Sequence, residues 1–268
     1  MRNVILAPFR NETKPKTLWL FEKIEMILRK IIIGLLATVL ISCNSSQKEN
    51  STKNLETYPD IKIVGAMKNA MWKGELSGNI NLDTISDKNG LYGLGPVSYL
   101  KGELLINNGK SYVSKVISDS TMAVEKEFNV SAPFFVYANV TEWNEIELES
   151  NVKTLQDLEK FIDNNTSDLK RPLAFKLIGQ VTSAIIHIQN LPEGTEVSSP
   201  TEAHQGQTNY RLENENTELV GFFSTEHKGV FTHHDSFLHI HLVTADENQM
   251  GHLDELEIGK MKLYLPKK

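Results

Sequence analysis

The residues best suited to chemistry in this 268-residue chain are its histidines, seven of which lie between His204 and His252. In the segment FLHIHLV, residues 237–243, strand alternation places His239 and His241 on one face. The apolar residues between them take the other face, which we expect to point into a core. Two imidazoles two residues apart on a strand can reach one metal ion.

A third histidine can join this pair. The polar segment Thr244–Gln249 predicts a turn, Gly251 lets the chain pass closely, and His252 can return as a third ligand. Three neutral imidazoles with one open position form a known catalytic zinc arrangement. The alternative is that the pair binds nothing, as is true of many His-x-His pairs. Asp254 is either a carboxylate that orients a ligand histidine or a turn residue after the strand.

Composition restricts the ligands of such a metal. The single cysteine excludes an intramolecular disulfide and a cysteine-rich zinc site, so histidines and carboxylates remain. A content of 40% hydrophobic and 23% charged residues is typical of a globular protein, and the net charge of −6 argues against a nucleic-acid surface. We expect His204 and His227 on the surface. His233 and His234 are expected in a loop, exposed to solvent or lining the entrance to the site.

The first 42 residues have the features of an export signal. Arg29 and Lys30 precede an apolar run, Ile31–Ile41, that is too short to span a bilayer securely. The run ends in LISC, which resembles a bacterial lipobox whose cysteine is Cys43. We expect the true start at Met26 and a protein that is exported and lipid-anchored to the bacterial cell envelope, on a periplasmic or surface face. The alternatives are a signal peptide with an incidental cysteine and a short membrane anchor.

After the signal, the chain divides into a tether and a folded body. Residues 43–57 are rich in Ser, Asn, Lys and Glu without apolar periodicity, which predicts a flexible tether. Residues 43–268 carry 21 basic and 31 acidic residues, so the body is clearly acidic. We expect residues 58–268 to form one α+β, mainly β domain. It should contain mixed or antiparallel sheets and one or two helices, with the metal site on a strand in its C-terminal part.

Local patterns predict elements of that domain. Thr154–Asn164 has apolar residues at helical spacing, with Thr154 as the N-cap. Asn108-Gly109 is typical of a tight hairpin turn within residues 103–113. Gly90–Gly95 (GLYGLG) predicts a glycine-rich turn, and residues 191–210 predict a polar connection long enough to suggest a function. Further strands are expected at 61–64, 132–140, 173–189, 219–224, 237–244 and 261–265.

These segments, in this order, resemble the α-acetolactate decarboxylase family. Gly93-Leu94-Gly95, followed by LKGEL at residues 100–104 and NGKSY at residues 108–112, is similar to one block of that family. Ala132-Pro133-Phe134 and VGFF at residues 220–223 are similar to two others. The most specific likeness is the His-x-His motif followed by MGHLD at residues 250–254, with the family's spacing of ten residues between His241 and His252. The resemblance covers residues 61–265.

The resemblance implies an activity and a set of site residues. The activity is that of a lyase, the zinc-dependent decarboxylation of 2-acetolactate to acetoin and CO₂ in acetoin biosynthesis. His239, His241 and His252 would hold Zn²⁺, and Glu103 would be the carboxylate facing it rather than an exposed strand residue. The implied partners are a small keto acid, a membrane contacted through the lipid and, as one arrangement, a second copy in a homodimer, with no nucleic acid.

Two features depart from the family pattern. The family has an arginine facing the substrate in a segment corresponding to Lys176–Ile188, where this chain has none and where His187 takes about that place. The family also continues past the C-terminal Leu265-Pro266 with acidic residues, one of them functional, whereas Lys267-Lys268 follows here. An imidazole lacks the two-pronged donor geometry of a guanidinium. We nevertheless expect His187 at a catalytic position.

The altered pattern leaves three functions open. The first is an acetolactate decarboxylase or a relative acting on another β-keto or α-hydroxy acid. The second is an inactive lipoprotein of the same fold that binds a metal or a small acid, and the third is a purely structural metal site. A cation such as Lys101 or Arg211 near the three histidines would favour the enzyme.

Overall fold

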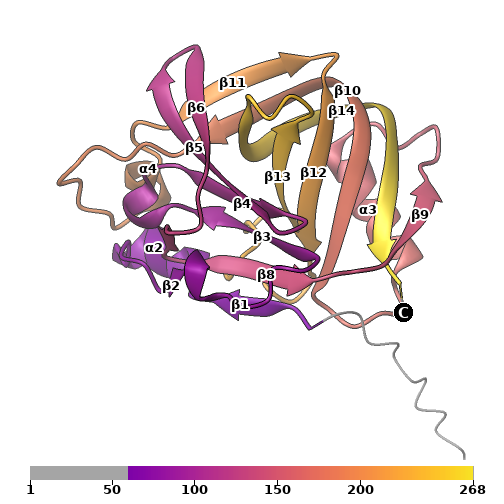
Figure 1. Ribbon diagram of the computed structural model, residues 1–268, viewed down its shortest axis with the longest axis horizontal. Helices are drawn as coiled ribbons and strands as arrows, with labels where there is room; N and C mark the ends of the chain where they lie inside the picture. Colours follow the sequence, from indigo (N-terminus) through magenta and orange to yellow (C-terminus); the bar gives the residue numbers. More distant parts are fainter. Residues whose placement is uncertain (1–59, 268) are drawn as a thin grey trace, which may run out of the picture. The chain divides into compact units, whose positions relative to one another are not determined.

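Two antiparallel sheets packed against each other build the body of the protein in this computed structural model, which describes residues 60–267 (Figure 1). The described residues belong to one compact unit. The export signal, lipidation of Cys43 and the tether at 43–57 lie outside the described residues and stay predictions. Within residues 60–267, no helix is long and apolar enough to cross a membrane.

The first sheet comes from the N-terminal half of the body and has the order β1-β8-β3-β4-β5-β6. Its strands are β1 Lys62–Val64, β3 Leu91–Pro96, β4 Glu103–Asn107, β5 Lys110–Ser118, β6 Thr121–Lys126 and β8 Phe135–Asn139. The predicted hairpin joins β4 to β5. Asn108 and Gly109 both have positive φ angles, 49° and 78°, which is why this turn carries Asn-Gly.

The prediction of a glycine-rich turn at 90–95 was wrong, since Leu91–Pro96 is the fully buried strand β3. The glycines allow close packing rather than a turn. A Cβ on Gly93 would lie 2.6 Å from the Phe135 ring, and one on Gly95 would collide with the Phe134 carbonyl. A glycine inside a strand commonly marks such a close approach.

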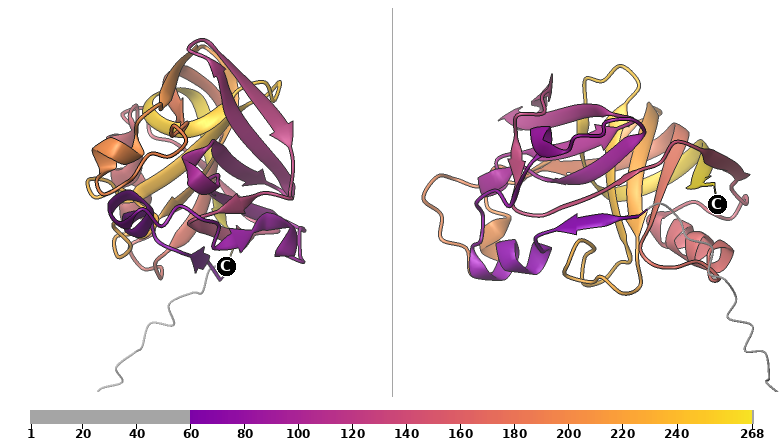
Figure 2. Two further views of the ribbon diagram at one scale, coloured as in Figure 1. Left: turned by 90° about the vertical axis from the view of Figure 1, so that its left-hand side faces the viewer. Right: turned by 60° about the horizontal axis from the view of Figure 1, so that its bottom comes forward.

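The second sheet closes on itself. Its order is β11-β10-β12-β13-β14-β9, and the additional pairing of β10 with β14 completes a ring through β10, β12, β13 and β14. The long, curved strands β10 and β14 make this closure, as Figures 1 and 2 show. The strands are β9 Trp143–Glu147, β10 Leu173–Ile188, β11 Thr208–Glu213, β12 Asn216–Phe223, β13 Leu238–Thr244 and β14 Met250–Pro266. Only residues 261–265 of β14 had been expected as strand.

Short elements complete the described chain. The helices are α2 Met67–Lys73, α3 Leu155–Asn165 and α4 Pro200–Ala203, with 3₁₀ turns η1 Leu82–Thr84 and η2 Ser98–Leu100 and the small sheet of β2 Ile80–Asn81 with β7 Ser131–Ala132. The predicted helix is α3, and Thr154 is its N-cap. Thr154 Oγ1 accepts the Asp157 N–H while the Asp157 carboxylate accepts the Thr154 N–H.

Strand β13 of the ring is buried on both faces. Leu238, Ile240 and Leu242 of β13 point into an interior core, which α3 covers with Leu158, Phe161 and Ile162. The opposite face of the ring packs on the first sheet through a second core that includes Val220, Phe222, Val243 and Met250. A side chain on that opposite face of β13 therefore lies between the two sheets and away from water.

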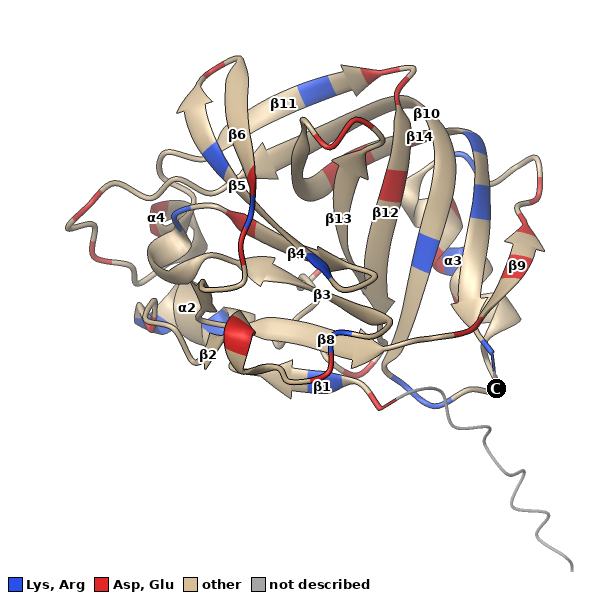
Figure 3. Ribbon diagram, viewed as in Figure 1, with Lys and Arg blue, Asp and Glu red and all other residues tan. Residues whose placement is uncertain are grey.

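Charges at one end of the sheets help to hold them together. Figure 3 shows acidic and basic residues interspersed over the strands. In the turn after β13, the Glu247 carboxylate accepts a hydrogen bond from Tyr112 Oη at 2.7 Å and pairs with Lys126 Nζ at 2.5 Å. These contacts, Lys126 foremost, lower the pKa of Glu247 from 4.5 to about 2.

We predict that Glu247 makes stability depend on acid. Because its pKa is lower in the folded state, its contribution is present above about pH 4.5 and is lost as the pH falls towards 2. Glu247→Gln should cost about 0.5–1 kcal/mol at pH 7 and little at pH 2. Urea unfolding of both proteins at several pH values measures this, and an equal loss at pH 7 and pH 2 would contradict it.

Candidate metal site

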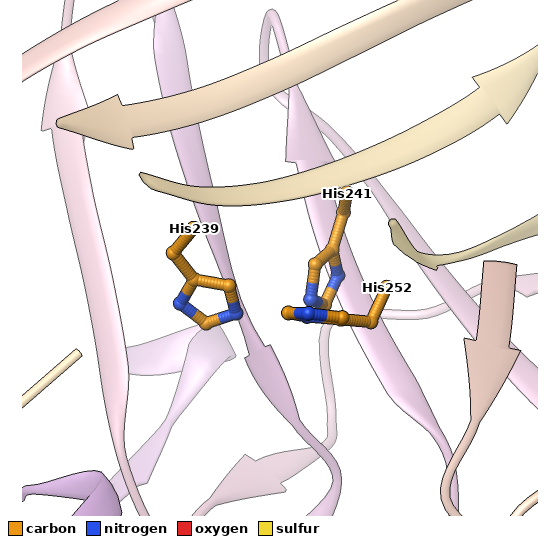
Figure 4. Close-up of side chains that lie close together, drawn as sticks. All are labelled: His239, His241 and His252. Carbon is orange, nitrogen blue, oxygen red and sulfur yellow. The ribbon is translucent and has the colours of Figure 1, made fainter. Parts of the chain in front are cut away.

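Three histidines from two neighbouring strands point toward one another between the sheets (Figure 4). His239 and His241 lie on β13, on the face opposite Leu238 and Ile240, as the alternation predicted. His252 lies on β14 directly across from His241 in the strand register. The ring centroids are 5.2 Å apart for His239 and His241, 5.0 Å for His239 and His252, and 5.3 Å for His241 and His252.

The hairpin between β13 and β14 sets this register. Residues 245–249 form the predicted turn, and β14 then runs between β13 and β10, so that His252 faces His241 on one side and His187 on the other. A Cβ on Gly251 would lie 2.6 Å from the His187 carbonyl oxygen. The expectation that a glycine lets the chain pass closely here is confirmed.

Burial leaves ring nitrogens of this trio without partners. His239, His241 and His252 are only 3%, 0% and 7% exposed. Neither nitrogen of His241, nor Nδ1 of His239, has a hydrogen-bond partner. A buried polar atom without a partner costs about 1–3 kcal/mol, and a metal ion would remove that cost. One nitrogen from each ring lies within 4.8 Å of the other two, so the donor set and its spacing fit a metal ion.

The same burial keeps the rings neutral, which metal binding requires. Burial and the charge of nearby His187 lower the pKa of His241 to about 3. The Leu104 backbone opposes this shift. Burial likewise lowers the pKa values of His239 and His252 well below 6.5, and the neighbouring histidines add to the effect.

Glu103 reaches the trio from the opposite sheet. It begins β4, is 3% exposed, and places Oε2 3.7 Å from His241 Nε2. Its Oε1 accepts the Gln189 N–H at 3.3 Å. Burial raises its pKa well above 4.5, the Gln189 N–H opposes this, and the charge of Asp254 adds to it. Glu103 is therefore not an exposed strand residue.

His187 lies next to the trio, 4.6 Å from His252 between ring centroids. Its Nδ1 contacts both oxygens of Asp254 at 2.8 Å, and its Nε2 faces Gln189 Nε2 at 3.3 Å. Asp254 thus orients a histidine, but that histidine is His187 and not one of the three predicted ligands. The sequence analysis gave no role to Gln189. Its position two residues after His187 was the one signal in the sequence that could have placed it at the site.

The remaining histidines divide by location. His233 lies in the connection between β12 and β13 and is half-buried, with Nε2 3.1 Å from His252 Nε2. Of the two placements expected for it, exposed to solvent or lining the entrance, it has the second. His234 and His204 are exposed. His227 differs from its expected surface position, since it is half-buried, contacts Ser224 Oγ at 2.8 Å and stacks on Phe231.

Two cavities meet at this site. An inner one of about 20 Å³, enough for one water or ion, is lined by Glu103, Gln189, four apolar residues and His187, His204, His233, His239 and His252. An outer one of about 380 Å³ shares His233 and His252 with it. Neither lining includes a lysine or arginine among the described residues. Lys101 lines a separate cavity, and Arg211 is exposed and paired with Glu213.

A family model described as Alpha-acetolactate decarboxylase matches residues 65–267, which confirms the resemblance seen in the sequence. Among curated proteins, no relative matches the chain.

Solved structures share the fold. The alpha-acetolactate decarboxylase of Bacillus subtilis strain 168 has a TM-score of 0.64 and 23% identity, covering 78% of this chain and 86% of that chain. The acetolactate decarboxylase of Bacillus subtilis subspecies spizizenii gives 0.63 and 23%, with the same coverage. A Staphylococcus aureus protein of unknown function, described as similar to alpha-acetolactate decarboxylase, gives 0.64 and 16%, covering 76% and 84%.

We predict that replacing His241 has opposite effects with and without metal. In the presence of a metal chelator, His241→Leu should raise the free energy of unfolding by about 1 kcal/mol relative to the wild type, because it removes a buried imidazole without hydrogen-bond partners. With a divalent ion at 100 times its dissociation constant, the wild type should gain about 2.7 kcal/mol that the variant loses. Denaturant unfolding with EDTA and with Co²⁺ measures both signs. A destabilised variant under both conditions would mean that His241 serves packing alone.

Proposed function

We propose that this chain, which belongs to the alpha-acetolactate decarboxylase family, decarboxylates 2-acetolactate or a closely similar β-keto acid with a zinc ion held by His239, His241 and His252. The observation that most supports this proposal is that functional side chains from the two sheets face one another at one place. Three buried neutral imidazoles come from one sheet, and a buried carboxyl group, Glu103, faces them from the other.

The reaction makes two demands on such a site. Loss of CO₂ from a β-keto acid leaves negative charge as an enediolate, which has to be stabilised as it forms. One proton must then be added to the carbon that lost CO₂, so that the acetolactate anion and a proton give acetoin and CO₂. A zinc ion, when bound, would supply Lewis-acid stabilisation of that charge.

Glu103 is the group placed to handle the proton. Because Oε1 accepts the Gln189 N–H, the proton of the neutral acid belongs on Oε2, the oxygen nearer His241. An acid fixed on one sheet delivers its proton from one side only, which would set the chirality of acetoin. Glu103 is held by β4 rather than by a loop, so its position is well defined.

The substrate needs more space than the inner cavity offers. About 20 Å³ does not hold a five-carbon acid, so the substrate would extend into the outer cavity, which shares His233 and His252 with the inner one. His187 lies where the resemblance places the family arginine, beside His252 and Glu103. We assign it to the carboxylate end of the substrate.

A second candidate function is metal binding without decarboxylation. The absence of lysine and arginine from both cavity linings among the described residues favours it, because a carboxylate substrate would find no fixed cation. Export and lipid anchoring through Cys43 also remain our proposal, resting on the lipobox-like sequence. An enzyme placed there would meet external or leaked substrate.

We predict that the purified protein binds zinc and releases acetoin and CO₂ from racemic 2-acetolactate. The double variant His239→Ala/His241→Ala should lose both the metal and the activity, and His234→Ala, an exposed neighbouring histidine, should keep both. Elemental analysis and a colorimetric acetoin assay provide the two readouts. Zinc bound without acetoin above the double variant would replace the decarboxylase with the second candidate function.

We predict that Glu103→Gln separates chemistry from metal binding. The amide keeps the size of the side chain but cannot give up a proton as the acid does. The acetoin rate should fall about 100- to 10,000-fold, with zinc content unchanged. A rate within a few-fold of the wild type would show that another group delivers the proton.

A further inference from the structure

We propose that the side-chain oxygen of Gln189 accepts the hydroxyl hydrogen of the substrate. The site is thereby restricted to small acids with a hydroxyl group on the carbon that bears the carboxylate. The inference rests on the proposed function, which supplies the substrate, and it concerns a residue outside the histidine trio and Glu103. It follows from the hydrogen bonds that fix the Gln189 amide.

Gln189 lines the inner cavity from the end of β10. It lies two residues after His187, so strand alternation puts both side chains on one side of the chain. It lines the cavity together with His187 and Glu103 and is only 3% exposed. Its backbone N–H donates to Glu103 Oε1. The amide group of its side chain therefore lies among the groups on which the proposed reaction depends.

Asp254 and His187 fix the Gln189 amide from one side. A carboxylate only accepts hydrogen bonds, so His187 Nδ1, which lies 2.8 Å from both Asp254 oxygens, carries the ring hydrogen. The other nitrogen of the neutral ring, Nε2, is then an acceptor. Gln189 Nε2 lies 3.3 Å from it and donates one amide hydrogen. A reversed amide would place Gln189 Oε1 against the same lone pair, which is unfavourable.

Gln207 fixes the same amide from the other side. Its own Nε2 donates to Asn209 Oδ1 at 2.9 Å, which leaves its Oε1 as an acceptor. That oxygen lies 3.2 Å from Gln189 Nε2 and takes the second amide hydrogen. A glutamine amide has two hydrogens, so both are used. The Gln189 side chain can therefore offer an occupant of the cavity only its Oε1, a hydrogen-bond acceptor.

The long polar connection at residues 191–210 brings Gln207 to this place. Gln207 is the last residue before β11, and the preceding Gly206 has a φ of 74°. A Cβ on Gly206 would lie 2.3 Å from the Asn190 carbonyl oxygen, next to Gln189. Glycine therefore lets the end of the connection pack against the end of β10. In this proposal, one function of the connection is to hold Gln207 against the Gln189 amide.

The Oε1 atom of Gln189 is buried and has no hydrogen-bond partner among the described residues. A buried acceptor of this kind favours an occupant that carries a donor. In the 2-acetolactate anion the carboxylate and the ketone only accept, so the hydroxyl group is the single donor. This hydroxyl is attached to the same carbon as the carboxylate. A substrate with its carboxylate at His187 therefore brings its hydroxyl beside Gln189.

The competing explanation gives Gln189 a purely structural task. In that case the amide only links His187 to Gln207, and a single water satisfies Oε1 whatever the ligand. The two explanations differ in selectivity. Loss of a structural amide affects ligands with and without a hydroxyl equally, whereas loss of an acceptor for the hydroxyl affects only the ligands that carry one.

Steady-state kinetics of the purified protein supplied with Zn²⁺ test the proposal. The two substrates are 2-acetolactate and 2-methyl-3-oxobutanoate, the same acid without the hydroxyl, each corrected for spontaneous decarboxylation. Gln189→Met keeps the length of the side chain and removes the amide. It should lower the ratio of the two kcat/KM values about 10- to 100-fold, with zinc content unchanged.

Gln205→Met is the matched control, at an exposed glutamine of the same connection, and it should keep the wild-type ratio. An unchanged ratio in Gln189→Met, with acetoin still formed, would overturn the inference and leave the proposed function standing.

Calorimetric titration with inert acids supplies a readout that needs no turnover. The wild type supplied with Zn²⁺ should bind 2-hydroxyisobutyrate more tightly than isobutyrate, and Gln189→Met should reduce that preference about tenfold or more. A metal ion can also select a hydroxyl, so the change on substitution decides and not the wild-type preference. A preference lost in Gln189→Met, in a wild type that forms no acetoin, would overturn the proposed function alone. Equal preference in both proteins, or no binding of either acid, would overturn the inference.

Gln207→Met takes the place of Gln189→Met if that variant does not fold. Without the Gln207 oxygen, one amide hydrogen of Gln189 loses its acceptor, and the amide is no longer held in one orientation. The preference for the hydroxyl acid should then fall at least about threefold. A preference equal to that of the wild type would overturn the inference.

Discussion

Burial of imidazole nitrogens between two sheets is the constraint on which this structure depends. His241 is fully buried with neither ring nitrogen bonded, and Nδ1 of His239 is in the same state. An apolar side chain of similar size would avoid the desolvation cost of these groups. A metal ion would convert that cost into ligand bonds, which would link the stability of this region to the function that we propose through one set of atoms.

The closed ring of the second sheet makes this burial possible. β13 has one face in the interior core and the other toward the first sheet, and it is buried along its whole length. The histidines occupy the face between the sheets, where Glu103 of β4 can reach them. The candidate site therefore combines three histidines of one sheet with a carboxyl group of the other, and any loosening of the sheet packing would separate the two.

The acidic character of the candidate site is unusual for the acid substrate that we propose. Both cavities lack lysine and arginine among the described residues, and the outer one is lined by carboxylates. The metal ion that we propose for the three histidines would supply positive charge at this site. The rings of His187 and His233 lie near the trio, with centroids 4.6 Å and 5.0 Å from that of His252, and Asp254 contacts His187.

The sequence alone determined those structural features that depend on residues close together along the chain. The alternation of β13, the Asn-Gly hairpin, the Thr154 cap and the return of His252 through Gly251 all follow from local rules, and the family followed from ordered motifs. Tertiary structure alone decided that Gly93 and Gly95 lie in a strand, that β14 runs unbroken to close the ring, and that Asp254 and Gln189 meet His187. Those features arise from contacts between residues tens of positions apart, such as Phe135 against Gly93, which no local pattern encodes.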